Sequence, residues 1–364
     1  MVKPRVIVGM SSGVDSSVAA ALLKKQGYDI VGVFMRFWKE PLRDDLVENK
    51  CCSLESYEDA RKVCQILDIP LYTANVEREF KREVVDYFLS EYEAGRTPNP
   101  CVACNEHIKF NVLFKKMLEI KGDYVASGHY AVIRKNNDGK YHLFQGVDKD
   151  KDQSYFLYNF NQKQLAKILF PVGQYKKAQI RALAKKMKLP VFNKDDSQGL
   201  CFTPEKYPEG FLRRHLKMKK GKTLNTSGKI VGKHEGLPLY TIGQRRGINI
   251  GGNGPYYVVE KNIKKDILVV TNNEKDPALF RKNMKVKKVN WIVSEPDLPV
   301  GIYVKNRYRK PAVGATINPA ESQQSAVYRK YEIIFDKPQQ AVSPGQSAVF
   351  YTKKGEMLGG GIIL

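Results

Sequence analysis

Apolar runs and amphipathic stretches alternate along the first 205 residues. The apolar runs are short and typical of buried strands, and they cover residues 5–9, 30–34, 71–75 and 124–127. The stretches between and after them predict helices over 16–26, from Ser56 onward, and over 79–94, 105–119 and 176–187. Ser56 and Asp59 predict a capping box at the start of the second helix. This alternation predicts an α/β domain with a parallel sheet and helices on both faces.

The pattern changes after residue 205. Residues 206–277 are rich in Lys and Gly and carry short strands and turns, which predicts a small mixed central domain. Residues 278–364 contain closely spaced short strands, a pattern typical of a small antiparallel β-barrel. These predicted strands cover 286–293, 301–308, 314–317, 326–335, 347–351 and 357–363. We therefore expect three domains, at residues 1–205, 206–277 and 278–364.

The charge of the chain indicates its kind of partner. There are 61 Lys and Arg against 38 Asp and Glu, which gives a formal net charge of +23. A solvated surface or a genome that favours Lys would account for part of this excess, but a polyanionic partner such as nucleic acid accounts for it better. Basic residues are densest after residue 205, and the run 307–310 (Arg-Tyr-Arg-Lys) combines cations for phosphates with a ring for stacking on a base.

Targeting signals are missing from the sequence. No apolar run reaches 18 residues, so no membrane span is expected, and the first strand begins too early for a signal peptide. The six cysteines are not spaced like a secreted disulfide framework. We therefore expect a cytoplasmic monomer with reduced thiols.

The loop from Gly9 to Ser17 carries the first candidate chemistry. It reads Gly-Met-Ser-Ser-Gly-Val-Asp-Ser-Ser and joins the first strand to the first helix. Backbone N–H groups at a helix N-terminus favour an anion, and phosphate is the natural guest. An ordinary turn with a serine cap would also use small residues, but the order Ser-x-Gly-Val-Asp-Ser favours a phosphate site. A Walker A loop is excluded, because the first glycine required before residues 221–223 would fall on Leu216.

Three cysteines are candidates for reactive thiols. Cys101 and Cys104 form a Cys-x-x-Cys pair at the start of a predicted helix, where the helix dipole stabilises a thiolate. Cys201 follows turn-forming residues and is expected on a loop. These settings favour reactivity for Cys104 and Cys201, although each thiol could instead be a small core residue.

The other three cysteines have weaker claims. Cys64 lies on the apolar face of its helix and is predicted to be a core residue. For Cys51 and Cys52 the sequence predicts no role. A structural zinc site is not favoured, because Cys201 has no nearby second cysteine.

Six motifs follow one another in a fixed order. They are the loop 9–17, Arg-Thr-Pro-Asn-Pro-Cys-x-x-Cys-Asn (96–105), Ser-Gly-His-Tyr (127–130), Lys-Asp-Gln-Ser-Tyr-Phe-Leu (151–157), Asp-Ser-x-Gly-x-Cys-Phe (196–202) and Thr-Ile-Gly-Gln-Arg (241–245). The first resembles the PP-loop of ATP pyrophosphatases, SGGxDS, except that Ser12 stands where glycine is usual. Serine tolerates a positive φ less well than glycine. Together the motifs resemble the tRNA-specific 2-thiouridylases (the MnmA/TrmU family) over essentially the whole chain.

The resemblance implies a fold and an activity. The fold would be an adenine nucleotide α-hydrolase-like PP-loop domain followed by the central domain and the barrel. The enzyme would use ATP with Mg²⁺ to adenylate the C2 oxygen of the tRNA wobble uridine and would replace that oxygen with sulfur, giving 2-thiouridine. Asp15 would help to hold the metal–pyrophosphate group.

The resemblance also implies roles for two cysteines. Cys201 would carry sulfur as a persulfide received from a sulfur-relay donor, either a cysteine desulfurase or a carrier protein. Cys104 would be the nucleophile, which either attacks the persulfide and ends in a disulfide with Cys201 or contacts the activated base. Two thiols make chemical sense, because releasing persulfide sulfur as sulfide needs two electrons that disulfide formation supplies.

The matched motif positions imply two sets of binding residues. For ATP they are Gly9, Met10, Ser11, Ser12, Gly13, Val14, Asp15, Ser16, Met35 and Gly128. For tRNA they are Asn99, Pro100, Cys101, His129, Lys151, Asp152, Gln153, Arg307, Tyr308 and Gln346. His129 has a structural alternative, that of a satisfied core histidine.

Three further hypotheses stay open at this point. Cys101, Cys104 and Cys201 could hold a [4Fe–4S] cluster with one open iron, a hypothesis that ranks below the persulfide route. A PP-loop enzyme that adenylates a small molecule and uses ammonia would explain the loop but neither the cysteines nor the charge. An RNA-binding or RNA-chaperone module with a vestigial nucleotide site would explain the charge alone.

Overall fold

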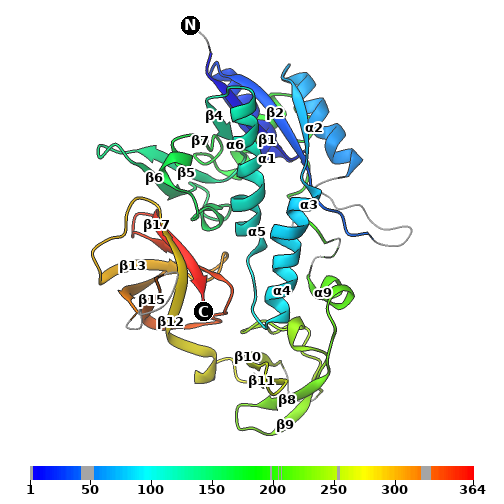
Figure 1. The fold of residues 1–364 in the computed structure, drawn as a ribbon, viewed down its shortest axis with the longest axis vertical. Helices are drawn as coiled ribbons and strands as arrows, with labels where there is room; N and C mark the ends of the chain where they lie inside the picture. The colour runs from blue at the N-terminus through cyan, green and yellow to red at the C-terminus, as the bar shows by residue number, and fades with distance from the viewer. Residues whose placement is uncertain are drawn as a thin grey trace.

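The computed structural model describes residues 3–41, 53–196, 199–203, 205, 207–251, 255–320 and 329–364. Cys51, Cys52, Ser197 and the start of the strand predicted from residue 326 lie outside this part of the chain. Three sheets organise the described residues, and Figure 1 shows them as three parts of an elongated molecule. None of the described helices combines the length and the apolar content needed to span a bilayer.

A five-stranded parallel sheet forms the first part, in the order β3-β2-β1-β4-β7. Its strands are β1 (Arg5–Met10), β2 (Asp29–Arg36), β3 (Leu71–Asn75), β4 (Tyr124–Ala126) and β7 (Ile168–Leu169). Alternate residues of β1 face opposite sides: Val6 and Val8 pack in one apolar cluster and Ile7 packs in another. The clusters lie on opposite faces of the sheet, which confirms the predicted α/β domain.

Helices cover both faces of this sheet. Those on the face of Val6 are α1 (Val14–Lys25), α2 (Leu54–Ile66) and α8 (Lys177–Lys186). Helix α2 is capped by Ser53, whose hydroxyl accepts the Ser56 N–H at 3.1 Å. The predicted cap at Ser56 was therefore wrong, because the helix begins one turn earlier.

Two long helical rods cover the other face and lie side by side in Figure 1. One consists of α3 (Glu77–Phe80), a π-helical segment (Lys81–Asp86) and α4 (Tyr87–Glu93); the other consists of α5 (Pro100–Ala103), a π-helical segment (Cys104–Lys109) and α6 (Phe110–Glu119). The second rod was predicted to start at residue 105 but starts at Pro100, because the fixed φ of proline suits the first helical position. Cys104 therefore lies inside a helix rather than at its mouth.

A small mixed sheet forms the second part, with the order β10-β11-β8-β9. Its strands are β8 (Gly221–Asn225), β9 (Ile230–His234), β10 (Tyr257–Asn262) and β11 (Ile267–Thr271), and helix α9 (Glu209–His215) precedes them. Within this sheet the β8–β11 pairing is parallel, and the other described pairings are antiparallel. Short helical segments elsewhere are α7 (Gln162–Leu165) and the 3₁₀ turns Ser154–Phe156, Leu237–Leu239 and Pro277–Leu279. The mixed sheet agrees with the predicted central domain.

An antiparallel barrel forms the third part. Its strands are β12 (Phe280–Trp291), β13 (Val300–Lys305), β14 (Val313–Pro319), β15 (Tyr331–Gln340), β16 (Ser347–Tyr351) and β17 (Glu356–Ile363). Strand β17 pairs with both β16 and β12, so these six strands close into a barrel. The predicted barrel is confirmed.

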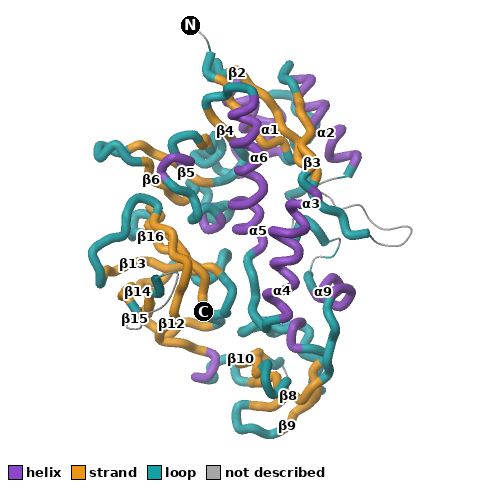
Figure 2. The backbone as a smooth tube through the Cα atoms, viewed as in Figure 1, coloured by secondary structure: helices purple, strands orange, loops and turns teal. Residues whose placement is uncertain are grey.

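One hairpin joins the barrel from far away in the sequence. Strands β5 (Ala131–Lys135) and β6 (Tyr141–Gln145) follow the parallel sheet's β4, yet β6 pairs with β17 through Leu143 and Met357. Figure 2 shows these strands between the helical part and the barrel. One sheet therefore crosses the predicted boundaries between residues 1–205 and 278–364.

His142 fastens this hairpin to β17. Its side chain is buried, with Nδ1 2.6 Å from Glu356 Oε1 and Nε2 3.0 Å from Asp138 Oδ2. Burial opposes protonation, but the hydrogen bonds with the two carboxylates outweigh it and raise the pKa of His142. Because the folded pKa lies above the unfolded one, the stabilisation is complete below about pH 6.5 and is lost as the pH rises through the folded pKa.

Replacing His142 with glutamine tests this fastening. We expect His142→Gln to lower the free energy of unfolding by about 1–2 kcal/mol at pH 6, because charged hydrogen bonds are lost. Urea unfolding at pH 6 and pH 9 should show a smaller difference from the wild type at the higher pH. His107→Gln, at an exposed site, is the control and should show no such trend. A difference that does not change with pH would contradict the charged state of His142.

Candidate active site

The loop between β1 and α1 is built to bind an anion. Gly13 precedes α1 with extended backbone and gives the helix no side-chain cap. The hydroxyls of Ser16 and Ser17 donate to the Gly13 carbonyl at 3.1 and 2.9 Å, and the Ser11 N–H donates to Ser16 Oγ at 3.2 Å. Because no side chain caps α1, its first N–H groups suit a phosphate.

Ser12 adopts the conformation that its glycine-like position demands. Its φ is +58°, in the left-handed region, and its side chain is buried. The hydroxyl accepts a hydrogen bond from Lys194 Nζ at 3.3 Å, and the same ammonium lies 2.6 Å from Asp59. The serine therefore adds a polar contact that glycine lacks, at a conformational cost of roughly 1–2 kcal/mol.

The other residues predicted to bind ATP lie at the same edge of the sheet. Gly9, Met10 and Met35 are at the carboxyl ends of β1 and β2, and Gly128 follows β4. A Cβ on Gly128 would lie 2.6 Å from the backbone of Asp15 and Ser16, so only glycine allows this approach. The structure thus brings the predicted set together at the edge where open α/β sheets bind ligands.

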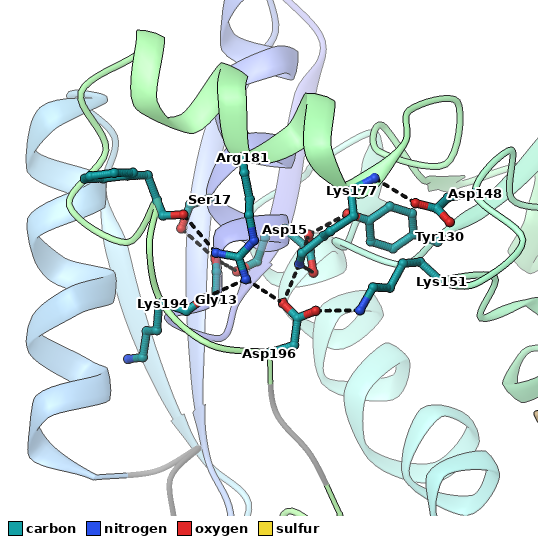
Figure 3. Close-up of polar contacts among 12 residues, drawn as sticks. Gly13, Asp15, Ser17, Tyr130, Asp148, Lys151, Lys177, Arg181, Lys194 and Asp196 are labelled. Carbon is teal, nitrogen blue, oxygen red and sulfur yellow. Dashed lines mark hydrogen bonds and ion pairs between the residues drawn. The ribbon is translucent and has the colours of Figure 1, made fainter.

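A network of charges surrounds Asp15, as Figure 3 shows. Lys177 Nζ, from the first turn of α8, lies 2.8 Å from both carboxylate oxygens of Asp15 and 2.7 Å from Asp196 Oδ1. Asp196 Oδ2 accepts from Lys151 Nζ at 2.7 Å. Lys177 thereby connects the loop to Asp196, which stands five residues before Cys201.

The network fixes the charge state of Asp196 and of a neighbouring tyrosine. Burial would raise the pKa of Asp196, but the hydrogen bonds from Lys151 and Lys177 outweigh it and lower this pKa to about 2. Tyr130 donates its hydroxyl to Asp15 Oδ1 at 2.7 Å, and burial together with this carboxylate raises the pKa of Tyr130 far above its usual range. Both groups keep one protonation state throughout the physiological range.

Cys101 and Cys104 occupy different environments on the same helix. Cys101 lies in the first turn and is exposed, whereas Cys104 lies one turn further and is 4% exposed. The π-helical segment begins at Cys104, and such segments occur often at functional sites. Cys104 was predicted at the start of the helix but lies one turn inside it, and Cys101 is the thiol nearer to the helix N-terminus.

Cys201 lies in a turn, as predicted, and is partly buried. The next residue, Phe202, is buried and packs its ring 5.3 Å from Phe88 on α4 and 6.0 Å from Phe80 on α3. Cys104 belongs to the same apolar cluster, and Cys201 packs against it. The residue next to Cys201 is therefore fixed against the helical rod that spans residues 77–93.

A metal site does not emerge from this arrangement. The described residues contain no group of three or more His, Cys, Asp or Glu side chains placed to hold a metal ion. The iron–sulfur hypothesis for the three cysteines therefore gains no support from the geometry of the described residues.

His129 shows the features of its structural alternative. Its Nδ1 is 2.7 Å from the Ser127 hydroxyl, and its ring packs 5.8 Å from Phe110 and 5.9 Å from Phe170. Burial, helped by Lys109, lowers the pKa of His129 to about 3, so the imidazole is neutral. A tRNA contact of His129 stays a prediction and would involve an uncharged ring.

The residues 151–153, predicted to bind tRNA, are largely occupied by protein contacts. Asp152 is buried and accepts from the N–H groups of Gly146 and Ser154, both at 3.1 Å. Gln153 Oε1 accepts the Tyr130 N–H at 3.0 Å. Lys151 is partly exposed but bonded to Asp196. Contacts of these residues with tRNA therefore stay predictions.

Arg307 and Gln346 lie at the junction where the three parts of the chain meet. Arg307 donates to the Ile242 carbonyl at 2.9 Å, and Gln346 Nε2 donates to the carbonyls of Thr97 and Pro98 at 3.0 and 3.1 Å. The hydroxyls of Thr97 and Thr241 lie 3.1 Å apart. Gln346 thus positions the loop that precedes Pro100, and Arg307 binds the neighbouring segment at Ile242.

Tyr308 and Asn99 lie beside this junction. The Tyr308 ring packs 4.4 Å from that of Phe156, and burial raises its pKa, with Asp152 and Cys101 as further causes. Asn99 forms a side-chain hydrogen bond with Tyr155 and directly precedes Pro100. The structure therefore places Asn99, Pro100, Cys101 and Tyr308 close together, with Pro100 buried, and their contacts with tRNA stay predictions.

Sequence reasoning missed Lys177, Arg181, Lys194 and Tyr130, and it assigned no role to Asp196. Tyr130 and Asp196 lie in motifs noted above, but the partners of Lys177 and Lys194 lie 162 and 135 residues away in the chain. No local pattern encodes such pairs.

Fold and site together define a PP-loop enzyme with two appended β domains. Family descriptions match three stretches: "tRNA methyl transferase HUP domain" at residues 4–205, "tRNA methyl transferase PRC-barrel domain" at 209–272 and "Aminomethyltransferase beta-barrel domain" at 281–363.

Relatives of known name match over nearly the whole chain. The tRNA-specific 2-thiouridylase MnmA 2 of Geobacillus kaustophilus is 44% identical over 99% of this chain and 94% of its own length. The tRNA-specific 2-thiouridylase MnmA of Proteus mirabilis is 44% identical over 99% of this chain and 96% of its own length. A solved 4-thiouridine synthetase–RNA complex with bound ATP is 15% identical with a TM-score of 0.34, covering 56% of this chain and 47% of that one. The chain belongs to the tRNA-specific 2-thiouridylase (MnmA) family of tRNA sulfurtransferases.

Two variants of Ser12 separate its strain from its hydrogen bond. Ser12→Gly and Ser12→Ala both lose the hydroxyl that binds Lys194, but only glycine accepts a φ of +58° without strain. We therefore expect Ser12→Gly to be more stable than Ser12→Ala by about 1 kcal/mol. Urea unfolding of both variants measures this difference, and equal stabilities would mean that the loop relaxes away from the left-handed conformation.

Gln346→Ala tests the junction. The two carbonyl acceptors at Thr97 and Pro98 lose their donor, at a cost of about 1–3 kcal/mol. We expect amide hydrogen exchange across residues 95–104 to accelerate by about tenfold or more, because the loop opens more often. Gln339→Ala, whose amide bonds only a neighbouring carbonyl, is the control and should leave this segment unchanged. Unaltered exchange in Gln346→Ala would show that other contacts hold the loop.

Proposed function

We propose that this protein converts the wobble uridine of tRNA to 2-thiouridine, using ATP to activate the C2 oxygen and a cysteine persulfide to supply sulfur. The observation that carries the proposal is the bridge from Asp15 through Lys177 to Asp196, which stands five residues before Cys201. An enzyme that activates a base and then delivers sulfur needs its nucleotide loop beside its sulfur-bearing segment. The printed names of its relatives support the same activity.

The activation step is an adenylation. The uracil O2 attacks the α-phosphorus of MgATP, the bond to the β-phosphate breaks, and pyrophosphate leaves with the electron pair. The loop residues 9–16 would bind the phosphates through their N–H groups, and Asp15 would face the Mg²⁺ that accompanies ATP. Met35 and Gly128 would line the nucleoside side.

The sulfur step uses both thiols. The Cys104 thiolate attacks the inner sulfur of the Cys201 persulfide, which forms the Cys104–Cys201 disulfide and releases hydrosulfide with its proton. Hydrosulfide adds to C2, AMP departs with the original oxygen, and loss of a proton leaves 2-thiouridine. The disulfide must be reduced before Cys201 accepts sulfur from the donor protein again. The alternative role of Cys104, a contact with the activated base, stays open.

Cys104 also bears on how the tRNA engages. The residue is buried, and the helix that carries it starts beside Asn99, Tyr308 and the exposed Cys101. A uridine must therefore leave its stack to reach the thiols, as in other enzymes that act on a base. The predicted tRNA contacts of Lys151, Arg307 and Gln346 would position the surrounding stem.

The ammonia-using alternative is less well supported. Such an enzyme would need the loop but has no use for two thiols packed in one apolar cluster, Cys104 within it and Cys201 against it. It would release AMP from ATP without tRNA, which a measurement of AMP with and without tRNA would detect. An RNA-binding module without chemistry would release none.

The decisive measurement is mass spectrometry of tRNA nucleosides after reaction with ATP and a persulfide donor. We expect the wild type to form 2-thiouridine, and Cys104→Ser and Cys201→Ser to lose at least about 100-fold of this activity because each lacks an essential sulfur nucleophile. Their affinity for tRNA should stay within about twofold, because phosphate contacts dominate it.

Cys64→Ala provides the matched control. This cysteine is buried in the cluster between the sheet and α2, and burial raises its pKa to about 11, so its thiol is inert. It should retain 2-thiouridine formation. Wild-type turnover in either Cys104→Ser or Cys201→Ser would refute the role of that cysteine.

A further inference from the structure

Lys177 is the cation in closest contact with the carboxylate of the phosphate loop, among the residues that the structure describes. Its side chain is 11% exposed, and its ammonium lies 2.8 Å from both oxygens of Asp15 and 2.7 Å from Asp196. Figure 3 shows it reaching from α8 to a point between the two carboxylates. The Lys177 ammonium thus forms ion pairs with two carboxylates at a site that is shielded from solvent.

Other cations near the loop are committed elsewhere. Lys194 contacts Ser12 but is paired with Asp59 at 2.6 Å. Arg181 donates to the carbonyls of Phe192 and Lys194, each at 2.9 Å, as well as to Asp196. Neither contacts Asp15, and Lys177 does so with two oxygens.

A bound nucleotide would change the balance of charge around Lys177. A triphosphate bound to the N–H groups of this loop would bring several negative charges next to Asp15, which needs compensation in a shielded site. Mg²⁺ and Lys177 are the cations at hand. The carboxylate of Asp15 can exchange its ammonium partner for the Mg²⁺ of MgATP, because carboxylates are favoured magnesium ligands.

We propose that Lys177 binds the phosphate chain of ATP and stabilises the departing pyrophosphate, while Asp196 is the positioning residue that holds its ammonium group. This rests on the proposed function for the identity of the reaction. In the step, the Pα–O bond breaks and the pyrophosphate oxygen takes the electron pair. Lys177 keeps its proton and offers N–H donors to that oxygen, which gains charge only as the bond breaks.

The position of Asp196 explains why Lys177 has two carboxylate partners. Asp15 must be released for Mg²⁺, and a lysine whose one partner leaves would be free to swing toward solvent. Asp196 keeps its contact with Lys177 and is itself held by Lys151 and Arg181. The lysine therefore stays beside the loop when its first partner changes.

The first experiment measures tRNA-dependent pyrophosphate release and the affinity for magnesium pyrophosphate by calorimetry. We expect Lys177→Met to lower kcat for pyrophosphate release by about 100-fold, as loss of a transition-state donor does, and to weaken magnesium pyrophosphate binding by about tenfold. Lys177→Arg should recover part of both. Lys185→Met, on the exposed end of the same helix, should match the wild type in both.

The second experiment is a double-mutant cycle. Asp196→Asn should lower kcat by about tenfold in the wild type but by less than about twofold in Lys177→Met, because a positioning residue acts only through its partner. The double variant also removes the repulsion between Asp15 and Asp196, so it separates lost chemistry from lost folding.

The outcomes are distinct. Wild-type kcat and pyrophosphate affinity in a folded Lys177→Met would overturn the proposal, and equal effects of Asp196→Asn in both backgrounds would overturn the positioning role. A wild-type enzyme without tRNA-dependent release would refute the proposed function instead. The calorimetry would still decide whether Lys177 binds pyrophosphate.

Discussion

One ammonium group connects the parts of this site that the sequence keeps furthest apart. Lys177 belongs to α8, Asp15 to the loop before α1, and Asp196 to the segment that leads to Cys201. Without the lysine, the carboxylates of Asp15 and Asp196 would repel each other across a shielded site. The phosphate loop and the segment that leads to Cys201 are therefore joined by this one charge, while apolar side chains pack α8 against α1.

A second constraint acts at the other end of the site. Gln346, next to barrel strand β16, and Thr241, in the segment before β10, hold the loop at Thr97 and Pro98, and the helix of Cys104 starts two residues later. The barrel is in turn paired to the parallel-sheet domain through β6 and β17. All three parts of the chain therefore help to position Cys104. A tRNA that bound across them would contact parts that are already joined to one another.

Periodicity predicted the elements because burial patterns are local: the strands of the parallel sheet alternate faces within a few residues. The motif departure at Ser12 was also informative, since the structure does place this residue at a φ of +58°. Contacts between distant residues could not be predicted, because neither the partner of Lys177 nor the sheet that β5 and β6 join is written in a local pattern. The start of the helix at Pro100 was missed because helical spacing of apolar residues begins only after the cysteine pair.

The ion pairs at the loop also bear on how a strongly basic chain binds ATP and RNA at different places. Lys177, Lys194 and Lys151 each have a carboxylate partner at 2.6–2.8 Å. Paired charges add little to the field at a distance, so these three lysines contribute little to the attraction that a net charge of +23 exerts on RNA. The polyanion is drawn instead by cations without such partners, and the loop offers its N–H groups to a phosphate chain small enough to enter. The loop then selects the nucleotide over RNA because carboxylates neutralise the lysines beside it, and not because lysines are missing there.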